Sequence, residues 1–246
     1  MKFFLAPMQG LTGYTVRNAF HHHFDYIDKY YTPFIPAAKR MNAKIKRDID
    51  PVNNDGITLI PQAMSIVADE VIDLHRQLVP YGYDEINVNL GCPSGTVVSK
   101  KRGSGILAYP DMLDSFLDEL YTKADFPVSI KTRVGFNDDE LWPKLIEIYS
   151  KYPISELTVH PRVQKDFYKN TPRMDDFALA MQKINPDKTT LCYNGDITDT
   201  NSFNALTDYF PDIDEIMIGR GLFANPALIA ELKGISMDKA ELRERL

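Results

Sequence analysis

The chain has 246 residues, of which 44% are hydrophobic and 25% are charged, the composition of an ordinary globular protein. Its net charge of −6 excludes a protein that binds nucleic acid through overall charge, and no stretch approaches the roughly 20 apolar residues of a membrane helix. Two cysteines make no disulfide framework and indicate a reducing compartment. We therefore expect a cytoplasmic, monomeric protein that is not bound to a membrane.

Eight short apolar runs have the pattern of parallel strands that are buried on both faces. In chain order they are Phe3–Ala6, Tyr26–Lys29, Thr58–Pro61, Glu85–Asn89, Val128–Thr132, Glu156–His160, Thr190–Asn194 and Glu215–Ile218. Helical patterns lie between them, at Val67–Leu78, Pro110–Leu120, Asp138–Tyr149, Asp175–Ile184, Thr200–Tyr209 and Pro226–Leu232. This alternation predicts an α/β protein with a (β/α)8 TIM barrel, which typically has about 250 residues. A doubly wound open sheet is the alternative, weakened because no Gly-x-Gly-x-x-Gly motif follows the first strand.

The last residues of the chain have a different pattern. Residues 236–246, with the sequence SMDKAELRERL, read as a helix that begins where the chain stops. We therefore assign residues 1–235 to the barrel and residues 236–246 to the start of a truncated C-terminal helical segment.

A thiol in a tight turn is the most informative feature of the sequence. Cys92 lies between Gly91 and Pro93, directly after the predicted strand Glu85–Asn89. A free cysteine is most often a small buried hydrophobe, and Cys192, inside an apolar run, is read that way. The turn around Cys92 is polar instead, which favours a working thiol.

Polar residues collect at the carboxyl end of nearly every predicted strand, where the active site of a (β/α)8 barrel lies. In chain order they are Pro7, Met8 and Gln9, Gln62, Asn89 and Cys92, Lys131 and Arg133, His160 and Arg162, Asn194-Gly195-Asp196, and Gly219-Arg220-Gly221. The last two groups follow strands seven and eight, the usual phosphate site of such barrels. They indicate a ligand that carries phosphate. Lys131 is either a salt-bridged lysine or a stabiliser of an anion formed during the reaction.

Two clusters of basic residues interrupt the acidic sequence. They are Lys39, Arg40, Lys44, Lys46 and Arg47, and Lys100, Lys101 and Arg102. Such runs are ordinarily solvated surface. His21-His22-His23 cannot converge on one ion, because consecutive helical residues point about 100° apart. No Cys/His cluster has zinc spacing, and we expect no metal.

Several of these motifs, in this order, resemble the FMN-dependent tRNA-dihydrouridine synthase family. The matching stretches are Leu5-Ala6-Pro7-Met8, Asn89-Leu90-Gly91-Cys92-Pro93-Ser94, Ser129–Gly135, Val159-His160-Pro161-Arg162, Asn194-Gly195-Asp196 and Ile218-Gly219-Arg220-Gly221. They extend over nearly the whole chain to about Pro226, and the Asn-x-Gly-Cys-Pro-Ser element is the most specific of them.

The resemblance implies an oxidoreductase that reduces the C5=C6 bond of specific tRNA uridines with FMN, which NADPH reduces. Cys92 would give a proton to C5, since a thiol with an ordinary pKa of about 8.5 is protonated at neutral pH. The implied FMN contacts are Pro7, Met8, Gln9, Gln62, Lys131, His160, Asn194, Gly195, Asp196, Gly219 and Arg220. Asn89, Arg133 and Arg162 would bind the substrate, and Lys100, Lys101, Arg102 and the segment 39–47 would meet the tRNA backbone.

The chain departs from the family in one main respect. Family members usually carry a C-terminal helical domain that grips tRNA, and this chain ends at Leu246, where that domain would begin. We therefore expect the domain to be absent or truncated. The alternatives are another FMN-dependent barrel, such as a dihydroorotate dehydrogenase, and a non-catalytic tRNA-binding module. The Gly91-Cys92-Pro93 turn argues against the first, and the presence of both Cys92 and Lys131 argues against the second.

Overall fold

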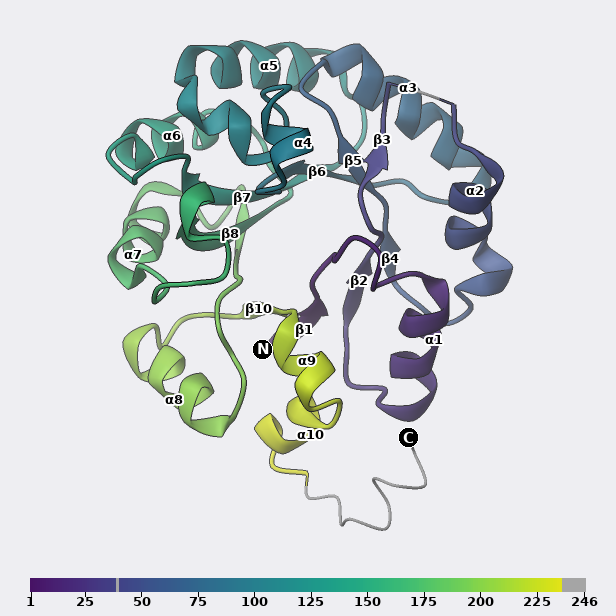
Figure 1. Cartoon of the computed structure of the whole chain (residues 1–246), viewed down its shortest axis with the longest axis vertical. Coiled ribbons are helices and arrows are strands. Elements are labelled where there is room, and N and C mark those ends of the chain that lie inside the picture. Colours follow the sequence, from purple (N-terminus) through teal and green to yellow (C-terminus); the bar gives the residue numbers. More distant parts are fainter. Residues whose placement is uncertain (39, 236–246) are drawn as a thin grey trace.

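The strands of the protein form one parallel sheet that curls into a barrel surrounded by helices (Figure 1). The computed structural model describes residues 1–38 and 40–235, and within these the sheet has ten strands. They are β1 (Lys2–Leu5), β2 (Lys29–Tyr31), β3 (Ile35–Pro36), β4 (Leu59–Ile60), β5 (Gln62–Met64), β6 (Ile86–Leu90), β7 (Val128–Gly135), β8 (Glu156–Val163), β9 (Thr190–Tyr193) and β10 (Glu215–Ile218). The assignment of residues 236–246 to a helical segment lies outside the described residues.

The helices follow the strands along the chain and pack around the outside of the sheet. They are α1 (Tyr14–His23), α2 (Ala43–Ile49), α3 (Ala68–Leu78), α4 (Gly95–Val98), α5 (Pro110–Lys123), α6 (Trp142–Tyr149), α7 (Met174–Lys183), α8 (Thr200–Tyr209), α9 (Arg220–Ala224) and α10 (Leu228–Leu232). Two 3-10 helices, η3 (Gly103–Ala108) and η4 (Gln164–Asp166), lie in the loops after β6 and β8. In the described part of the chain, no helix is both long and apolar enough to span a bilayer.

The strand order closes the sheet on itself. It runs β3-β5-β6-β7-β8-β9-β10-β1-β2-β4. We call each strand position around the barrel a stave. The second stave is divided into β2 and β3 and the third into β4 and β5, so the two end strands of the order, β3 and β4, belong to neighbouring staves. Only Pro61 separates β4, which pairs with β2, from β5, which pairs with β3 and β6. The Pro61 carbonyl accepts a hydrogen bond from the backbone N–H of Asn87 at 2.9 Å, so the break in the stave is bridged. Eight staves therefore make a (β/α)8 barrel, and the open-sheet alternative is wrong.

Two predicted elements are displaced in the structure. The second strand is Lys29–Tyr31 rather than Tyr26–Lys29, because Tyr30 and Tyr31 are the residues that the sheet buries. The helix expected from Asp138 begins only at Trp142. The Asp138 carboxylate accepts a hydrogen bond from the backbone N–H of Glu140, a local turn that competes with helix formation.

The barrel interior holds a small separate core. Its members are Phe4, Ala6, Tyr31, Ile60, Cys192 and Met217, whereas the larger core lies between the strands and the outer helices. The fully buried Cys192 is therefore a core residue, as predicted. Below this core, the Glu156 carboxylate accepts hydrogen bonds from Tyr31 at 2.6 Å and Lys29 at 2.7 Å. This bonding closes the floor of the barrel and leaves its other end for a ligand.

Candidate active site

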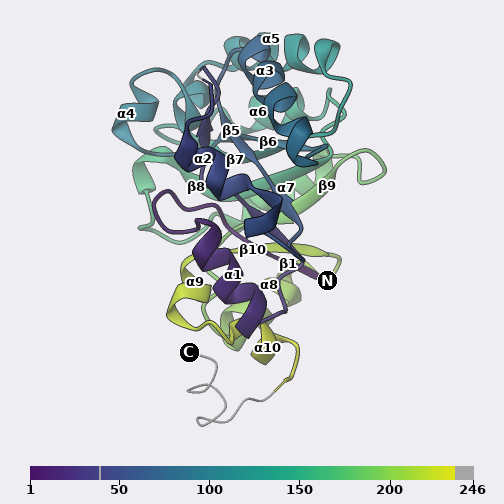
Figure 2. The same ribbon diagram turned by 90° about the vertical axis from the view of Figure 1, so that its right-hand side faces the viewer.

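A cavity of about 530 Å³ lies at the carboxyl ends of the strands. Figure 2 shows this side of the barrel, where α4 and α9 follow β6 and β10, opposite the N-terminus of the chain. Most of the predicted site residues line the cavity, namely Pro7, Met8, Gln9, Asn89, Cys92, Lys131, Arg133, His160, Asn194, Gly195, Asp196, Gly219 and Arg220. Five predicted residues do not belong to the lining, namely Gln62, Lys100, Lys101, Arg102 and Arg162.

Hydrogen bonds hold the backbone of Cys92 on both sides. The side-chain oxygen of Asn89 accepts from the backbone N–H groups of Gly91 at 3.1 Å and Cys92 at 2.9 Å. The Cys92 carbonyl accepts from the backbone N–H of Ser104 at 3.1 Å and from its hydroxyl at 2.9 Å. Gly103 permits this approach, because it has a φ of +55° and a Cβ there would lie 2.7 Å from the Cys92 carbonyl oxygen. The turn therefore fixes the thiol at the cavity wall.

Gln62 lies behind the cavity wall, where it orients Asn89. The Gln62 amide N–H donates to the side-chain oxygen of Asn87 at 2.8 Å, and the Asn89 amide donates to the oxygen of Gln62 at 2.8 Å. Gln62 is fully buried. Two buried amides bind its side chain, which does not belong to the cavity lining.

The thiol of Cys92 is in its protonated form at neutral pH. Burial raises its pKa, and the backbone N–H of Ser94 and the charges of Arg133 and Lys131 offset this only in part. A cysteine that acts as a nucleophile needs the opposite, a lowered pKa. The environment therefore suits a proton donor.

Lys131 faces the cavity from β7, and its Nζ donates to the side-chain oxygen of Asn194 at 2.6 Å. Burial, followed by repulsion from Arg133, lowers the pKa of this lysine to about 7. Within residues 1–38 and 40–235 no carboxylate pairs with Lys131, in contrast to the salt-bridged alternative. An anionic ligand beside Lys131 would raise this pKa again and so favour the charged ammonium form, which can bind the ligand.

Asp196 links two arginines at the mouth of the barrel. Both terminal nitrogens of Arg162 pair with its carboxylate, and Arg220 Nη2 donates to it at 2.6 Å. Arg162, which is 1% exposed, also lies 3.2 Å from His160 Nε2. Burial, and then the charges of Arg133 and Lys131, hold the pKa of His160 well below its usual range, so the ring is neutral. Arg162 thus orients cavity residues from behind and lies outside the lining itself.

Arg133 remains at the cavity, but its guanidinium is engaged. It donates to the carbonyls of Gly91 at 3.0 Å, Val163 at 3.0 Å and Phe167 at 2.7 Å. These bonds join the turn that carries Cys92 to the loop after β8. Arg133 therefore organises the wall and adds positive charge to it.

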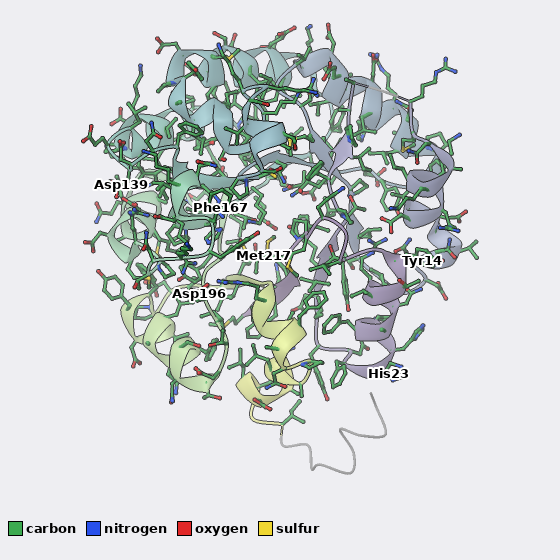
Figure 3. The ribbon with its side chains drawn as sticks, in the orientation of Figure 1. Tyr14, His23, Asp139, Phe167, Asp196 and Met217 are labelled. Atoms are coloured by element: carbon green, nitrogen blue, oxygen red, sulfur yellow. The ribbon has the colours of Figure 1, made fainter. Side chains whose placement is uncertain are left out.

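Three aromatic residues that the sequence did not reveal also line the cavity: the half-buried Phe34 and the exposed Phe167 and Tyr168. Phe167 is 47% exposed and Tyr168 is 52% exposed, and the guanidinium of Arg220 lies 4.8 Å from the centre of the Tyr168 ring. Figure 3 shows Phe167 and Asp196 beside the opening of the barrel. The position of Phe167 and Tyr168 soon after the strand Glu156–Val163 was the signal that could have revealed them, since this loop leaves the carboxyl end of a stave.

The described residues of the basic clusters do not belong to the cavity lining, and Lys39 lies outside the described residues. Lys100 and Lys101 are exposed after α4, and Arg102 pairs with Glu70 at 3.2 Å. On α2, Lys44, Lys46 and Arg47 are exposed. In the described ranges 1–38 and 40–235, no three His, Cys, Asp or Glu side chains gather closely enough to hold a metal ion.

The fold and the cavity together define a (β/α)8 barrel with a cationic mouth and a protonated thiol on its wall. Among known proteins, the profile of the family described as "Dihydrouridine synthase (Dus)" matches residues 4–245. The chain belongs to this family.

Individual relatives agree with the family match. The chain is 27% identical over 243 residues to tRNA-dihydrouridine synthase B of Pasteurella multocida (strain Pm70), an alignment that covers 95% of this chain and 69% of that protein. It is 34% identical over 154 residues to a probable tRNA-dihydrouridine synthase of Staphylococcus aureus (strain N315), covering 61% and 46%. With tRNA-dihydrouridine synthase B of Escherichia coli (strain K12) it shares 31% over 174 residues, covering 70% and 53%. The matched region thus spans about half to two thirds of these relatives.

Solved structures agree on the fold. Morphinone reductase has a TM-score of 0.63 at 11% identity, covering 98% of this chain and 88% of that chain. The structure titled "TcOYE with pHBA" has a TM-score of 0.63 at 7% identity, covering 99% and 92%. At such low sequence identity, these similarities support only the assignment of the barrel fold.

Proposed function

We propose that this chain is a tRNA-dihydrouridine synthase, an oxidoreductase that reduces the C5=C6 bond of uridines in tRNA with FMN and with NADPH as the reductant. The observation that carries the proposal is the protonated thiol of Cys92, held on the wall of a cationic barrel mouth in a member of the dihydrouridine synthase family. Both cysteines are free, which suits a cytoplasmic enzyme, and we propose that it acts as a monomer.

The residues at the mouth fit FMN. A side chain at Gly195 would place its Cβ 2.0 Å from the Tyr193 hydroxyl, so this position of the cavity lining requires glycine. The positive charges of Lys131, Arg133, Arg162 and Arg220 exceed the one carboxylate of Asp196, which favours an anion. We propose that the phosphate end is held by His160, Asn194, Gly195, Asp196, Gly219 and Arg220.

The ring system would lie against Pro7, Met8, Gln9 and Lys131, which also line the cavity. The chemistry that FMN supplies there when bound is a hydride for the uracil ring. Lys131 would stabilise negative charge on a ligand through its ammonium group, which such charge favours. Gln62 would contribute indirectly, because it orients Asn89.

Cys92 would provide the proton that completes the reduction. Addition of a hydride at C6 and of the thiol proton at C5 saturates the double bond and leaves a thiolate, which water reprotonates. Asn89, whose amide is fixed by Gln62 and by the backbone of Cys92, would position the uracil beside the thiol. The target uridine must leave its stack to enter the barrel mouth.

The tRNA backbone would contact the exposed basic residues beside the mouth. Lys100 and Lys101 follow the turn that carries Cys92, and Lys44, Lys46 and Arg47 lie on α2. Arg102 contributes less, because Glu70 already neutralises it. Binding that depends on such contacts weakens as salt is added.

The test uses the protein loaded with FMN and reduced by NADPH under anaerobic conditions. Unmodified tRNA should reoxidise the flavin and gain the mass of two hydrogens per modified uridine, whereas orotate should leave the flavin reduced. Rapid reoxidation by orotate with no effect of tRNA would favour the dihydroorotate dehydrogenase alternative. A protein that retains no flavin would instead be a binding module.

A further inference from the structure

Gln164 links the loop after β8 to the turn that carries Cys92 in the loop after β6. This residue begins η4, after β8, and its side-chain amide donates to the backbone carbonyl of Pro93 at 2.9 Å. Pro93 follows Cys92 directly and lies in the loop after β6, so the bond passes over the end of β7 between them.

The neighbouring backbone groups of the turn have other hydrogen-bond partners, whereas the Pro93 carbonyl is bound by Gln164. Arg133 holds the Gly91 carbonyl, Asn89 holds the Cys92 N–H and Ser104 holds the Cys92 carbonyl. Asn89 and Ser104 come from the same β–α unit as the thiol, and Arg133 comes from the next stave. Gln164 is therefore the anchor most distant in the sequence, 71 residues from Pro93.

The segment that carries Gln164 is itself firmly held. The Asp166 carboxylate accepts from the backbone N–H of Val163 at 3.1 Å and from the Asn170 amide at 2.5 Å, and it also pairs with Arg173. Phe167, next in the chain, has a φ of +51°, which a residue with a side chain adopts only when its surroundings hold it there. An anchor on such a segment can restrain the turn that carries Cys92.

We propose that Gln164 is a positioning residue for Cys92, a role that rests on the proposed function. Its amide fixes the Pro93 carbonyl so that the thiol stays against the cavity wall. Loss of this donor frees one side of the turn and lets the thiol swing toward solvent, while the cavity residues keep their places.

The alkylation rate of Cys92 tests this role independently of uridine reduction. The substitution Gln164→Glu keeps the shape of the side chain but, as a carboxylate, cannot donate to a carbonyl. Gln164→Leu removes the donor without adding charge. The rate constant for alkylation of the Cys92 thiolate by iodoacetamide, taken from a rate–pH profile so that a changed thiol pKa does not enter, should be about fivefold to tenfold higher in both variants, the effect of losing roughly one hydrogen bond. Gln182→Glu, which places the same charge on the exposed surface of α7, is the matched control and should react at the wild-type rate.

A second measurement separates positioning from a general structural defect. Both Gln164 variants should retain FMN and accept electrons from NADPH at the wild-type rate, whereas reoxidation by tRNA should slow about tenfold. Wild-type alkylation rates in both Gln164 variants would overturn the positioning role. Failure of the wild-type protein to reduce uridine, with faster alkylation in the variants, would instead overturn the proposed function and leave the positioning role intact.

Discussion

The side-chain oxygen of Asn89 accepts a hydrogen bond from the backbone N–H of Cys92 at 2.9 Å. Through this bond the end of a buried strand sets the position of the thiol. The amide nitrogen of the same asparagine donates to the side-chain oxygen of Gln62, and the amide nitrogen of Gln62 donates to the side-chain oxygen of Asn87. The amide chain has one arrangement that satisfies every member, so the turn that carries Cys92 is preorganised before a ligand arrives.

Asn89→Ala should reduce both stability and activity. It leaves the Gln62 oxygen and two backbone N–H groups without partners, and we expect a loss of about 1–3 kcal/mol in the free energy of unfolding. Urea denaturation measures the loss, with Asn204→Ala on the exposed face of α8 as the control. Equal stability of the two variants would show that the amide chain does not support the turn.

Lys131→Met should change how stability depends on pH in the ligand-free protein. Burial lowers the pKa of Lys131 to about 7, while in the unfolded chain it stays near 10.5. Between these values the unfolded chain binds a proton that the folded protein does not, so the wild type gains stability relative to the variant as pH rises from 7 to 10.5. Urea titrations across this window measure the difference. Lys188→Met at an exposed position should show none, and a flat difference for Lys131→Met would contradict the assigned environment.

Asp196→Asn should destabilise the phosphate end of the site. Burial alone would raise the pKa of Asp196, but hydrogen bonds and charge from Arg162, and then from Arg220, lower it overall. The carboxylate therefore stabilises the fold above its ordinary pKa of about 3.9, and this contribution is lost as pH falls through the lower folded value. We expect a cost of about 1–2 kcal/mol at pH 7, since the carboxylate is partly exposed to water.

The measurement for Asp196 is thermal or urea unfolding at pH 7 and again near pH 3. The exposed substitution Asp208→Asn on α8 serves as the control. If Asp196→Asn loses as much unfolding free energy near pH 3 as at pH 7, Asp196 stabilises the protein through its shape and not through its charge.

The barrel could be predicted from the sequence because parallel strands buried on both faces appear as apolar runs at a regular spacing. The division of the third stave at Pro61 could not, because its two halves pair with different partners that only the closed sheet brings together. The helix α1 could not be predicted from an apolar periodicity. Its buried face rests on few apolar residues, and Arg17 is buried there through bonds to Asn54 and Asp48.

The cavity residues could be predicted as a set because every carboxyl strand end reaches the same mouth. Their individual partners could not. Arg162 and Asp196 are 34 residues apart. Nothing in their local sequence shows that Arg162 pairs with the Asp196 carboxylate instead of binding a ligand directly. Phe167 and Tyr168 belong to a loop whose path depends on contacts with Arg133 and Asp166, which sequence periodicity does not report.

The most direct test of the account is single-turnover reduction of tRNA by Cys92→Ala. The variant should retain FMN and be reduced by NADPH at the wild-type rate, because the thiol is proposed to act only on the uracil ring. Formation of dihydrouridine should slow by about 100-fold or more, the usual contribution of a positioned general acid. Cys192→Ala, which removes the buried thiol inside the barrel, should keep its activity. Dihydrouridine formation by Cys92→Ala at the wild-type rate would contradict the assignment of Cys92 as the proton donor.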